Sequence, residues 1–259
     1  MAQIRPKLPN FSALRSTTRF EIAPRDDILR EEQAVRLFGN GAENALYEPL
    51  GRASSGPGGG DWLFLAATSA MTVAYRDGRE VSGSESNSQS RLTGAQPQLS
   101  TTGEFGPILT VVLRDALHGK VAWIHWEPGA GTPVAVFRYS VPAEESNYAV
   151  SDSPRDSPSG QASFPAYHGE IAADPATGAI LRILVLADTA SADVSETGIA
   201  VDYGPVEIAG KTYICPLRSV ALSRAPASPG HAPAQSHTLV NDTAFTRYHV
   251  FRSDVRIVP

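Results

Sequence analysis

Alternating apolar and polar positions in the second half of the chain predict antiparallel β-strands joined by tight turns. Residues 167–173 and 179–185 form two such runs, separated by an Asp-Pro-Ala-Thr-Gly turn signal. A second pair of runs covers 199–208 and 211–222. The segment 179–187 is apolar on both faces, so we expect it to be covered on both sides. Successive strands of this length predict a curved antiparallel sheet.

The same alternation is found closer to the N-terminus. It predicts a hairpin with strands at 120–126 and 132–141, and a strand pair between 62 and 81 that contains an Asp-Gly turn. Residues 8–22 fit either a first strand or a short helix leading into one. Residues 25–38 permit a helix, although their apolar positions have poor helical periodicity.

One segment has clear helical periodicity and predicts a helix over residues 102–118. Its apolar stripe consists of Phe105, Ile108, Leu109, Val112 and Ala116. Thr101 and Glu104 have the spacing of a capping box, and Gly119 suits the C-terminal end. Because an apolar stripe must pack against another element, we expect this helix to lie on the sheet.

Stretches rich in Ser, Gly and Pro predict flexible, exposed loops near residues 52–60, 82–102, 151–162 and 225–237. Strand patterns continue on both sides of each loop, so we interpret residues 1–259 as a single domain. The predicted class is α+β, mainly antiparallel, with a curved sheet packed against one main helix.

Composition excludes some classes of partner. The formal net charge of −5 argues against binding to a nucleic-acid backbone, which favours a basic surface. No apolar run reaches the ~18–20 residues of a transmembrane helix. The first ten residues lack the apolar core of a signal peptide, so either the protein is not exported or its signal was removed. Cys215 is the only cysteine and is interpreted as a small buried apolar residue.

No motif compels a reaction, a cofactor or a metal site. His125 and Glu127 have the His-x-Glu spacing of zinc deaminases, but the required Pro-Cys-x-x-Cys is missing. His168 and Glu170 fall on one strand face without a nearby third ligand. Asp202 precedes Tyr-Gly-Pro, which is typical of a bulge in a bending strand. We therefore assign no catalytic, cofactor or metal residues.

Several motifs resemble a family of uncharacterised exported proteins from acidobacteria, which are distantly similar to the outer-membrane lipoprotein carriers of the LolA/LolB-like fold. The resemblance covers roughly residues 8 to 251. Its motifs are Thr102-Gly-Glu-Phe-Gly-Pro107, Ala135-Val-Phe-Arg-Tyr-Ser-Val-Pro142, Tyr167-His-Gly-Glu-Ile171 with Asp174-Pro-Ala-Thr-Gly178, and Val201-Asp-Tyr-Gly-Pro-Val-Glu-Ile208 with Lys211-Thr-Tyr213. The resemblance implies an incomplete antiparallel barrel closed by helices, an apolar cavity for acyl chains, and a periplasmic or secreted location.

These observations favour a non-enzymatic, monomeric cell-envelope protein that binds a lipid, an acyl chain or a lipoprotein. The candidate ligand-binding residues are apolar side chains of the helix and of the 120–141 hairpin: Phe105, Leu109, Val112, Trp123, Phe137 and Tyr139. Core packing is the alternative role of the aromatic residues. Two further alternatives remain, a protein-interaction domain and a hydrolase. The hydrolase would need at least two dispersed residues to meet in a cleft, from Glu104, His125, Glu127, His168, Glu170 and Asp202.

Overall fold

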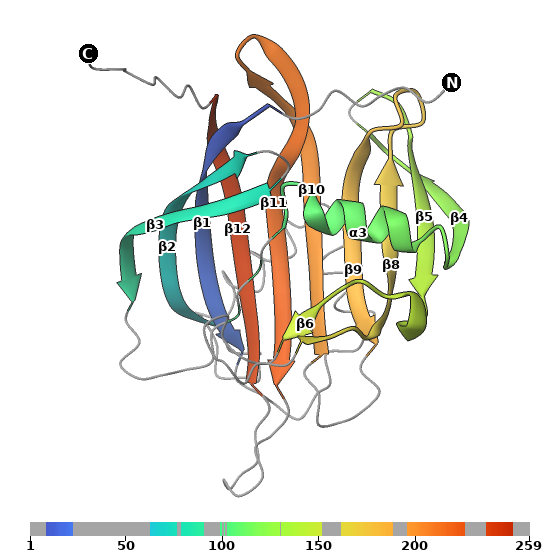
Figure 1. The fold of residues 1–259 in the computed structure, drawn as a ribbon, viewed down its shortest axis with the longest axis horizontal. Helices are drawn as coiled ribbons and strands as arrows, with labels where there is room; N and C mark the ends of the chain where they lie inside the picture. The colour runs from blue at the N-terminus through green and yellow to red at the C-terminus, as the bar shows by residue number, and fades with distance from the viewer. Residues whose placement is uncertain are drawn as a thin grey trace, which may run out of the picture.

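The computed structural model describes residues 9–22, 63–76, 79–90, 99, 101, 103–129, 131–151, 162–188, 196–225 and 237–250. Its main element is a ten-stranded antiparallel sheet in the order β3-β2-β1-β12-β11-β10-β9-β8-β5-β4 (Figure 1). The strands are β1 Phe11–Ile22, β2 Leu63–Arg76, β3 Arg79–Ser90, β4 Lys120–Glu127, β5 Val134–Val141, β8 Ala166–Ala173, β9 Ile180–Asp188, β10 Glu196–Ile208, β11 Lys211–Ala225 and β12 His237–Val250. Smaller elements are the helix α3 Pro107–Asp115, the 3-10 helix η1 Ala143–Glu145, and the two-stranded sheet of β6 Val150–Ser151 and β7 Ala162–Ser163.

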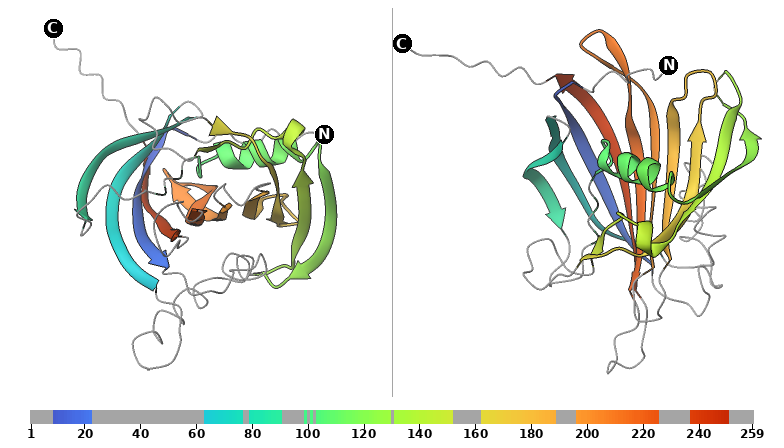
Figure 2. Two further views of the ribbon diagram at one scale, coloured as in Figure 1. Left: turned by 90° about the horizontal axis from the view of Figure 1, so that it is seen from below. Right: turned by 45° about the vertical axis from the view of Figure 1, so that its right-hand side comes forward.

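The predicted antiparallel α+β class is confirmed, and the main sheet is open, with β3 and β4 at its two edges. Seen from below, β1–β3 lie to one side of α3, and β4 and β5 lie to the other (Figure 2). We call the face of the sheet that carries α3 the inner face, and the opposite face the outer face. The incomplete barrel of the lipoprotein carriers stays a prediction.

All three predicted hairpins of the 120–222 region are confirmed as β4–β5, β8–β9 and β10–β11. The alternative of strand or helix near the N-terminus is resolved in favour of strand β1, which pairs with both β2 and β12. The expected irregularity at Asp202 is also present as a register shift between Asp202 and Tyr203. Strand β9 is buried on both faces, through Ile183 and Val185 on one and Leu184 and Leu186 on the other.

Two sequence-based predictions need correction. Residues 82–90 are not loop, since they continue β3 at the edge of the sheet. The ladder to β2 supplies their backbone hydrogen bonds, and an edge strand tolerates polar side chains. Residues 91–98 of the same predicted loop, the predicted loops at 52–60, 152–161 and 226–236, and the possible helix at 25–38 lie outside the described residues.

The helix begins at Pro107, not at residue 102 as predicted. Proline fits the first turn of a helix but disfavours helical geometry in the residue before it. Gly103 also has a φ of +100°, which lies outside the helical region, and its backbone turns just before α3. The predicted capping box therefore does not form at the start of α3. Instead, the Thr101 hydroxyl donates to the Glu104 carboxylate at 2.7 Å in the segment that precedes the helix.

Candidate functional site

The inner face has an apolar half, formed by β5, β8, β9 and β10, on which α3 packs. The buried side of α3 consists of Ile108, Val112 and Ala116, with Leu109 and Leu113 partly buried beside them. These residues belong to one cluster with the strand residues Tyr139, Val141, Tyr167, Ile171, Ile183, Val185, Ile199 and Val201. The contact between the helix and the sheet is therefore made by hydrocarbon and aromatic groups, which pack without directional constraints.

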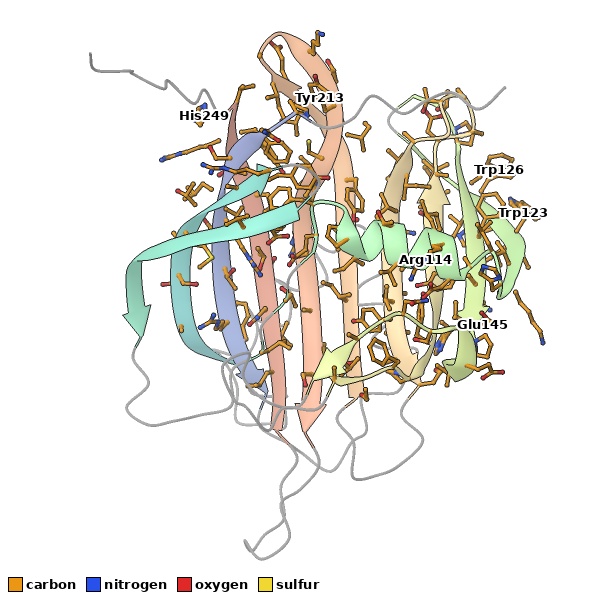
Figure 3. The ribbon with its side chains drawn as sticks, in the orientation of Figure 1. Arg114, Trp123, Trp126, Glu145, Tyr213 and His249 are labelled. Atoms are coloured by element: carbon orange, nitrogen blue, oxygen red, sulfur yellow. The ribbon has the colours of Figure 1, made fainter. Side chains whose placement is uncertain are left out.

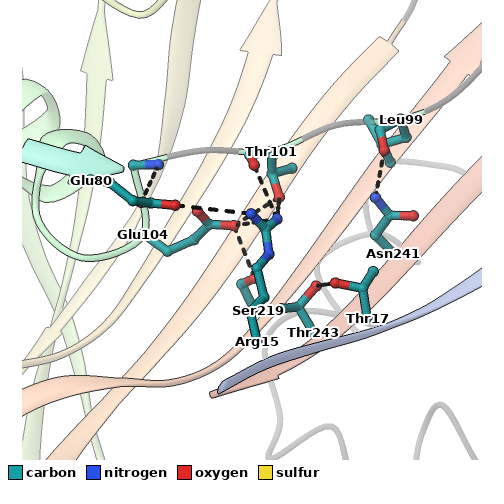
Figure 4. Close-up of polar contacts among 10 residues, drawn as sticks. Arg15, Thr17, Glu80, Leu99, Thr101, Glu104, Ser219, Asn241 and Thr243 are labelled. Atoms are coloured by element: carbon teal, nitrogen blue, oxygen red, sulfur yellow. Dashed lines mark hydrogen bonds and ion pairs between the residues drawn. The ribbon is translucent and has the colours of Figure 1, made fainter. Parts of the chain in front are cut away.

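The other half of the inner face, formed by β11, β12, β1 and β2, carries buried polar residues. These are Arg15, Thr17, Ser219, Asn241 and Thr243. The Thr17 and Thr243 hydroxyls lie 3.0 Å apart, and the Asn241 amide donates to the Leu99 carbonyl at 2.7 Å (Figure 4). The same half also contains an aromatic cluster with Phe11, Phe105 and Phe245 at its centre. We call these two regions the apolar half and the polar half.

The C-terminal end of α3 is held by a carboxylate whose hydrogen bonds are well formed. Asp115 is almost completely buried and accepts hydrogen bonds from the backbone N–H of Asn147 at 2.7 Å and from its side-chain amide at 2.9 Å. The Tyr167 hydroxyl donates to the same carboxylate at 3.0 Å. Burial, together with this hydrogen bond, raises the pKa of Tyr167. We call Asp115, Asn147 and Tyr167 the C-terminal anchor.

The N-terminal approach to α3 is held by a looser cluster of Arg15, Glu80, Thr101 and Glu104 (Figure 4), which we call the N-terminal anchor. The Arg15 guanidinium donates to the Thr101 carbonyl at 3.0 Å and lies 3.4 Å from Glu104 Oε1. Its other terminal nitrogen lies 3.9 Å from Glu80 Oε1, beyond hydrogen-bond distance. The backbone N–H of Gly103 donates to Glu80 Oε2 at 2.9 Å.

The N-terminal anchor places two carboxylates around one guanidinium in a buried site. The Glu104 side chain is 0% exposed, and its Oε2 has no hydrogen-bond partner. Desolvation, reinforced by the negative charge of Glu104, raises the pKa of Glu80 from its ordinary 4.5 to about 6. Removing carboxylates from water disfavours their charged form, and one arginine offsets only part of that cost.

The six predicted ligand-binding residues do not share one environment. Val112 and Tyr139 lie in the cluster between α3 and the apolar half, with Leu109 partly buried against it. Phe105 lies in the aromatic cluster of the polar half. Trp123 and Phe137 are register partners in the β4–β5 hairpin, but Trp123 is 53% exposed and Phe137 is half-buried.

Tyr139 is fixed in the apolar half by a specific contact. Its hydroxyl donates to the backbone carbonyl of Leu184 at 2.7 Å, and burial raises its pKa well above the ordinary value. Gly169 lies between the strands of these two residues. A Cβ atom at this position would lie 1.8 Å from the Leu184 carbonyl oxygen and 3.0 Å from the Tyr139 hydroxyl. Glycine is therefore required at 169 for this arrangement.

A register shift in β4 brings two tryptophans onto one face of its free edge. The shift lies between Trp123 and His125, so Trp123 pairs with Phe137 and Trp126 pairs with Ala135. The two indole rings are 6.2 Å apart, and Trp126 is 54% exposed. Figure 3 shows both at the β4 edge, away from the centre of α3. The exposed tryptophan pair was not predicted, because the bulge that aligns the two side chains has no signature in the sequence.

The six dispersed acidic and histidine residues do not all meet at one site, although Arg182, which bonds to Glu127, is the register partner of Asp202. Glu104 is buried at the inner face, whereas Glu170 pairs with Arg138 and His168 pairs with Asp188 at the surface. His125 and Glu127 are within 3.3 Å of each other, but Glu127 is also held by Arg182 at 2.9 Å. Among the described residues, no three His, Cys, Asp or Glu side chains are grouped so that they could hold a metal ion. Cys215 is buried, as predicted, and burial raises its pKa to about 12.

The comparisons with known proteins found no matching family model, no similar curated protein and no similar solved structure. Within the part of the chain that the structure describes, no helix combines the length and hydropathy that a membrane span requires.

Proposed function

We propose that this protein is a non-enzymatic binding protein of the cell envelope, which holds the acyl chain of a lipid or lipoprotein between α3 and the apolar half of the inner face. The observation that carries this proposal is the way in which α3 is held against the sheet. Its middle contacts the sheet through apolar side chains, and its position is fixed by polar anchors at its two ends.

A helix held in this way provides a surface that an acyl chain can share. The contacts of Ile108 and Val112 with the sheet are apolar on both sides, so methylene groups can replace them without leaving a polar group unpaired. A chain of about fourteen methylenes, at ~0.8 kcal/mol each, contributes roughly 11 kcal/mol before the costs of association. Ordering of the ligand and displacement of part of the helix contact reduce this value, but useful affinity remains.

The first test is whether the purified protein carries lipid. Extraction with organic solvent and mass spectrometry should detect acyl lipids in amounts stoichiometric with the protein. A protein that carries no lipid and takes up no fluorescent fatty acid would contradict the proposal.

A second experiment tests the position of the chain. Leu109→Trp places a fluorophore on α3 beside its apolar stripe, and a fatty acid brominated along its chain quenches tryptophan only at short range. We expect stronger quenching in this variant than in the matched control Val81→Trp, which replaces an exposed residue of edge strand β3. Equal quenching in both variants would place the acyl chain elsewhere.

A further inference from the structure

Polarity changes progressively along a single row of residues that crosses the inner face. The register partners in this row are, from β5 to β1, Tyr139, Gly169, Val185, Ile199, Ala221, Asn241 and Arg19. The first four lie in the apolar half, Ala221 of β11 packs against it, and the last two lie in the polar half. The next row has the same order, from Ile171, Ile183 and Val201 to Ser219, Thr243 and Thr17. These two rows of the inner face are therefore amphipathic in the direction across the strands.

The length of this gradient matches one acyl chain. Four strand spacings separate Val185 on β9 from Arg19 on β1, which corresponds to about 19 Å along the sheet. The hydrocarbon core of a bilayer is ~30 Å thick, so one leaflet, which is one acyl chain deep, measures about 15 Å. A chain lying across β9, β10 and β11 would place its polar end beside β12 and β1.

Among the described residues, Arg19 has no carboxylate partner, unlike Arg15, Arg182 and Arg218 of the same sheet. Arg15, four residues earlier on the same face, is bonded to Thr101 and Glu104 within the N-terminal anchor. On the outer face, Arg182 and Arg218 each bond to a carboxylate at 2.8–2.9 Å. Arg19 is only half-buried, yet its Nε is shielded from solvent and has no hydrogen-bond partner. A shielded guanidinium Nε without a partner is costly unless an acceptor approaches it.

The unpaired polar atoms lie on the same face of the sheet, although they are spread from β3 to β10. Among the described residues, the buried side-chain atoms without a hydrogen-bond partner are Arg15 Nε, Arg19 Nε, Glu80 Oε1, Glu104 Oε2 and Thr197 Oγ1. By strand alternation from Phe11, Ile199 and their register partners, all of these except Glu104 belong to inner-face positions, and Glu104 lies in the segment that crosses that face. Unsatisfied polar atoms are rare in folded proteins, and Arg19 Nε, which lies outside the N-terminal anchor, is a candidate contact for a polar ligand.

We propose that Arg19 binds the anionic head group, a carboxylate or a phosphate, of an acyl ligand whose chain lies across the apolar half. This inference rests on the proposed function and adds the ligand class to it: a single-chain anionic lipid. A guanidinium binds either group with paired, charge-assisted hydrogen bonds.

The test compares three ligands of equal chain length at pH 8: a saturated fatty acid, the primary alcohol and a monoacylglycerol phosphate. Binding is measured by displacement of a fluorescent fatty acid from the full-length protein. We expect the wild type to bind at least one of the two anionic ligands about 10- to 100-fold more tightly than the alcohol. Tighter binding of the phosphate would identify a lysophospholipid-type head group, and tighter binding of the fatty acid a free carboxylate.

Two arginine variants locate the preference. Arg19→Gln should reduce the affinity for the anion to that for the alcohol. Arg138→Gln, which removes the same charge from an exposed residue of the outer face, should leave the preference unchanged. The comparison of ligands in the wild type keeps the test valid even if Arg19→Gln folds poorly.

The experiment distinguishes failure of the Arg19 assignment from failure of the proposed function. If the wild type binds the acid, the alcohol and the phosphate equally, the role of Arg19 is overturned, whereas acyl binding stands. If the anionic preference survives in Arg19→Gln, another group binds the head group and the assignment is wrong. If none of the three ligands binds, the proposed function fails and this inference fails with it.

Discussion

The two ends of α3 are fixed by buried carboxylates, but the two anchors are built differently. At the C-terminal anchor, Asp115 accepts three hydrogen bonds of 2.7–3.0 Å from neutral donors. At the N-terminal anchor, Glu80 and Glu104 share Arg15 at 3.4–3.9 Å, and each keeps one oxygen without a hydrogen-bond partner. One end is held by a complete set of hydrogen bonds, and the other by a charge balance that depends on protonation.

This difference indicates which end of the helix is easier to release. A buried carboxylate with three short hydrogen bonds is firmly held, whereas two carboxylates around one arginine at 3.4–3.9 Å are held by longer and weaker contacts. If the helix moves when a ligand enters, we expect its N-terminal end to move first, around the turn at Gly103. Three predictions test this comparison and a fourth concerns the β4 edge of the sheet; they follow in order of decreasing effect on stability.

The largest loss of stability is expected for Arg15→Leu. Removal of the guanidinium leaves two carboxylates facing each other in a buried site, which should cost about 3–5 kcal/mol at pH 7. The cost should shrink at pH 5, because Glu80, whose pKa is about 6, then binds a proton and the repulsion is relieved. Urea unfolding at both pH values measures this effect. A loss below about 1 kcal/mol at pH 7 would show that the N-terminal anchor does not depend on its arginine.

Asp115→Ala should cost about 3 kcal/mol, because it leaves the Tyr167 hydroxyl and the Asn147 N–H without their buried acceptor. Tyr167→Phe is the matched control, since it removes one of the three hydrogen bonds and should cost about 1 kcal/mol. Urea unfolding at pH 7 measures both losses, and equal losses for the two variants would show that the Asn147 hydrogen bonds do not hold this end of α3.

Glu80 makes the N-terminal anchor sensitive to pH in a defined direction. Its pKa in the folded protein is about 6, above the ordinary 4.5, so the folded state binds the proton more tightly than the unfolded state. The protonated carboxyl therefore stabilises the fold at low pH, and this contribution is lost as the pH rises from about 4.5 through 6. The shift corresponds to about 2 kcal/mol.

Glu80→Gln isolates this contribution, because glutamine keeps an acceptor for the Gly103 N–H and cannot ionise. Relative to the variant, the wild type should become about 2 kcal/mol less stable between pH 4.5 and pH 7. Glu170→Gln, at an exposed ion pair of the outer face, is the control. Parallel stability curves for the wild type and Glu80→Gln would contradict the charge model of the N-terminal anchor.

The strands could be predicted from the sequence because their apolar alternation and their turns are local features. The β8–β9 and β10–β11 hairpins are the clearest examples. The N-terminal anchor could not be predicted, because it brings together β1, β3 and the segment before α3, which are separated by up to 89 residues. The spacing of Thr101 and Glu104 indicated that the two residues interact. The same spacing is typical of a capping box, and only the position of Pro107 argues against a helix that begins at Thr101.

The sequence indicates more weakly that Arg15 and Arg19 face the interior. They alternate with Phe11, Ala13 and Thr17 on one face of β1, where the burial of Phe11 implies burial of the whole face. Which face of β1 turns toward the interior is fixed by the pairing of β1 with β2 and β12. Those two strands are distant from β1 in the sequence. Charged residues at the inward positions of a strand are therefore the feature to look for in related cases.

The smallest effect on stability is expected at the edge of the sheet, for Trp123→Ala. An exposed side chain on an edge strand adds little to folding, so the free energy of unfolding should change by no more than about 0.5 kcal/mol. Strand β4 lies seven strand spacings, about 34 Å along the sheet, from Arg19 on β1, which is more than the length of one acyl chain bound there. Uptake of a long-chain or a shorter-chain fatty acid should therefore be unchanged in Trp123→Ala, as in Phe164→Ala, which truncates another exposed aromatic residue. Loss of long-chain uptake in Trp123→Ala alone would place the acyl chain across β5 and β4, beside Phe137, instead of across β9–β11.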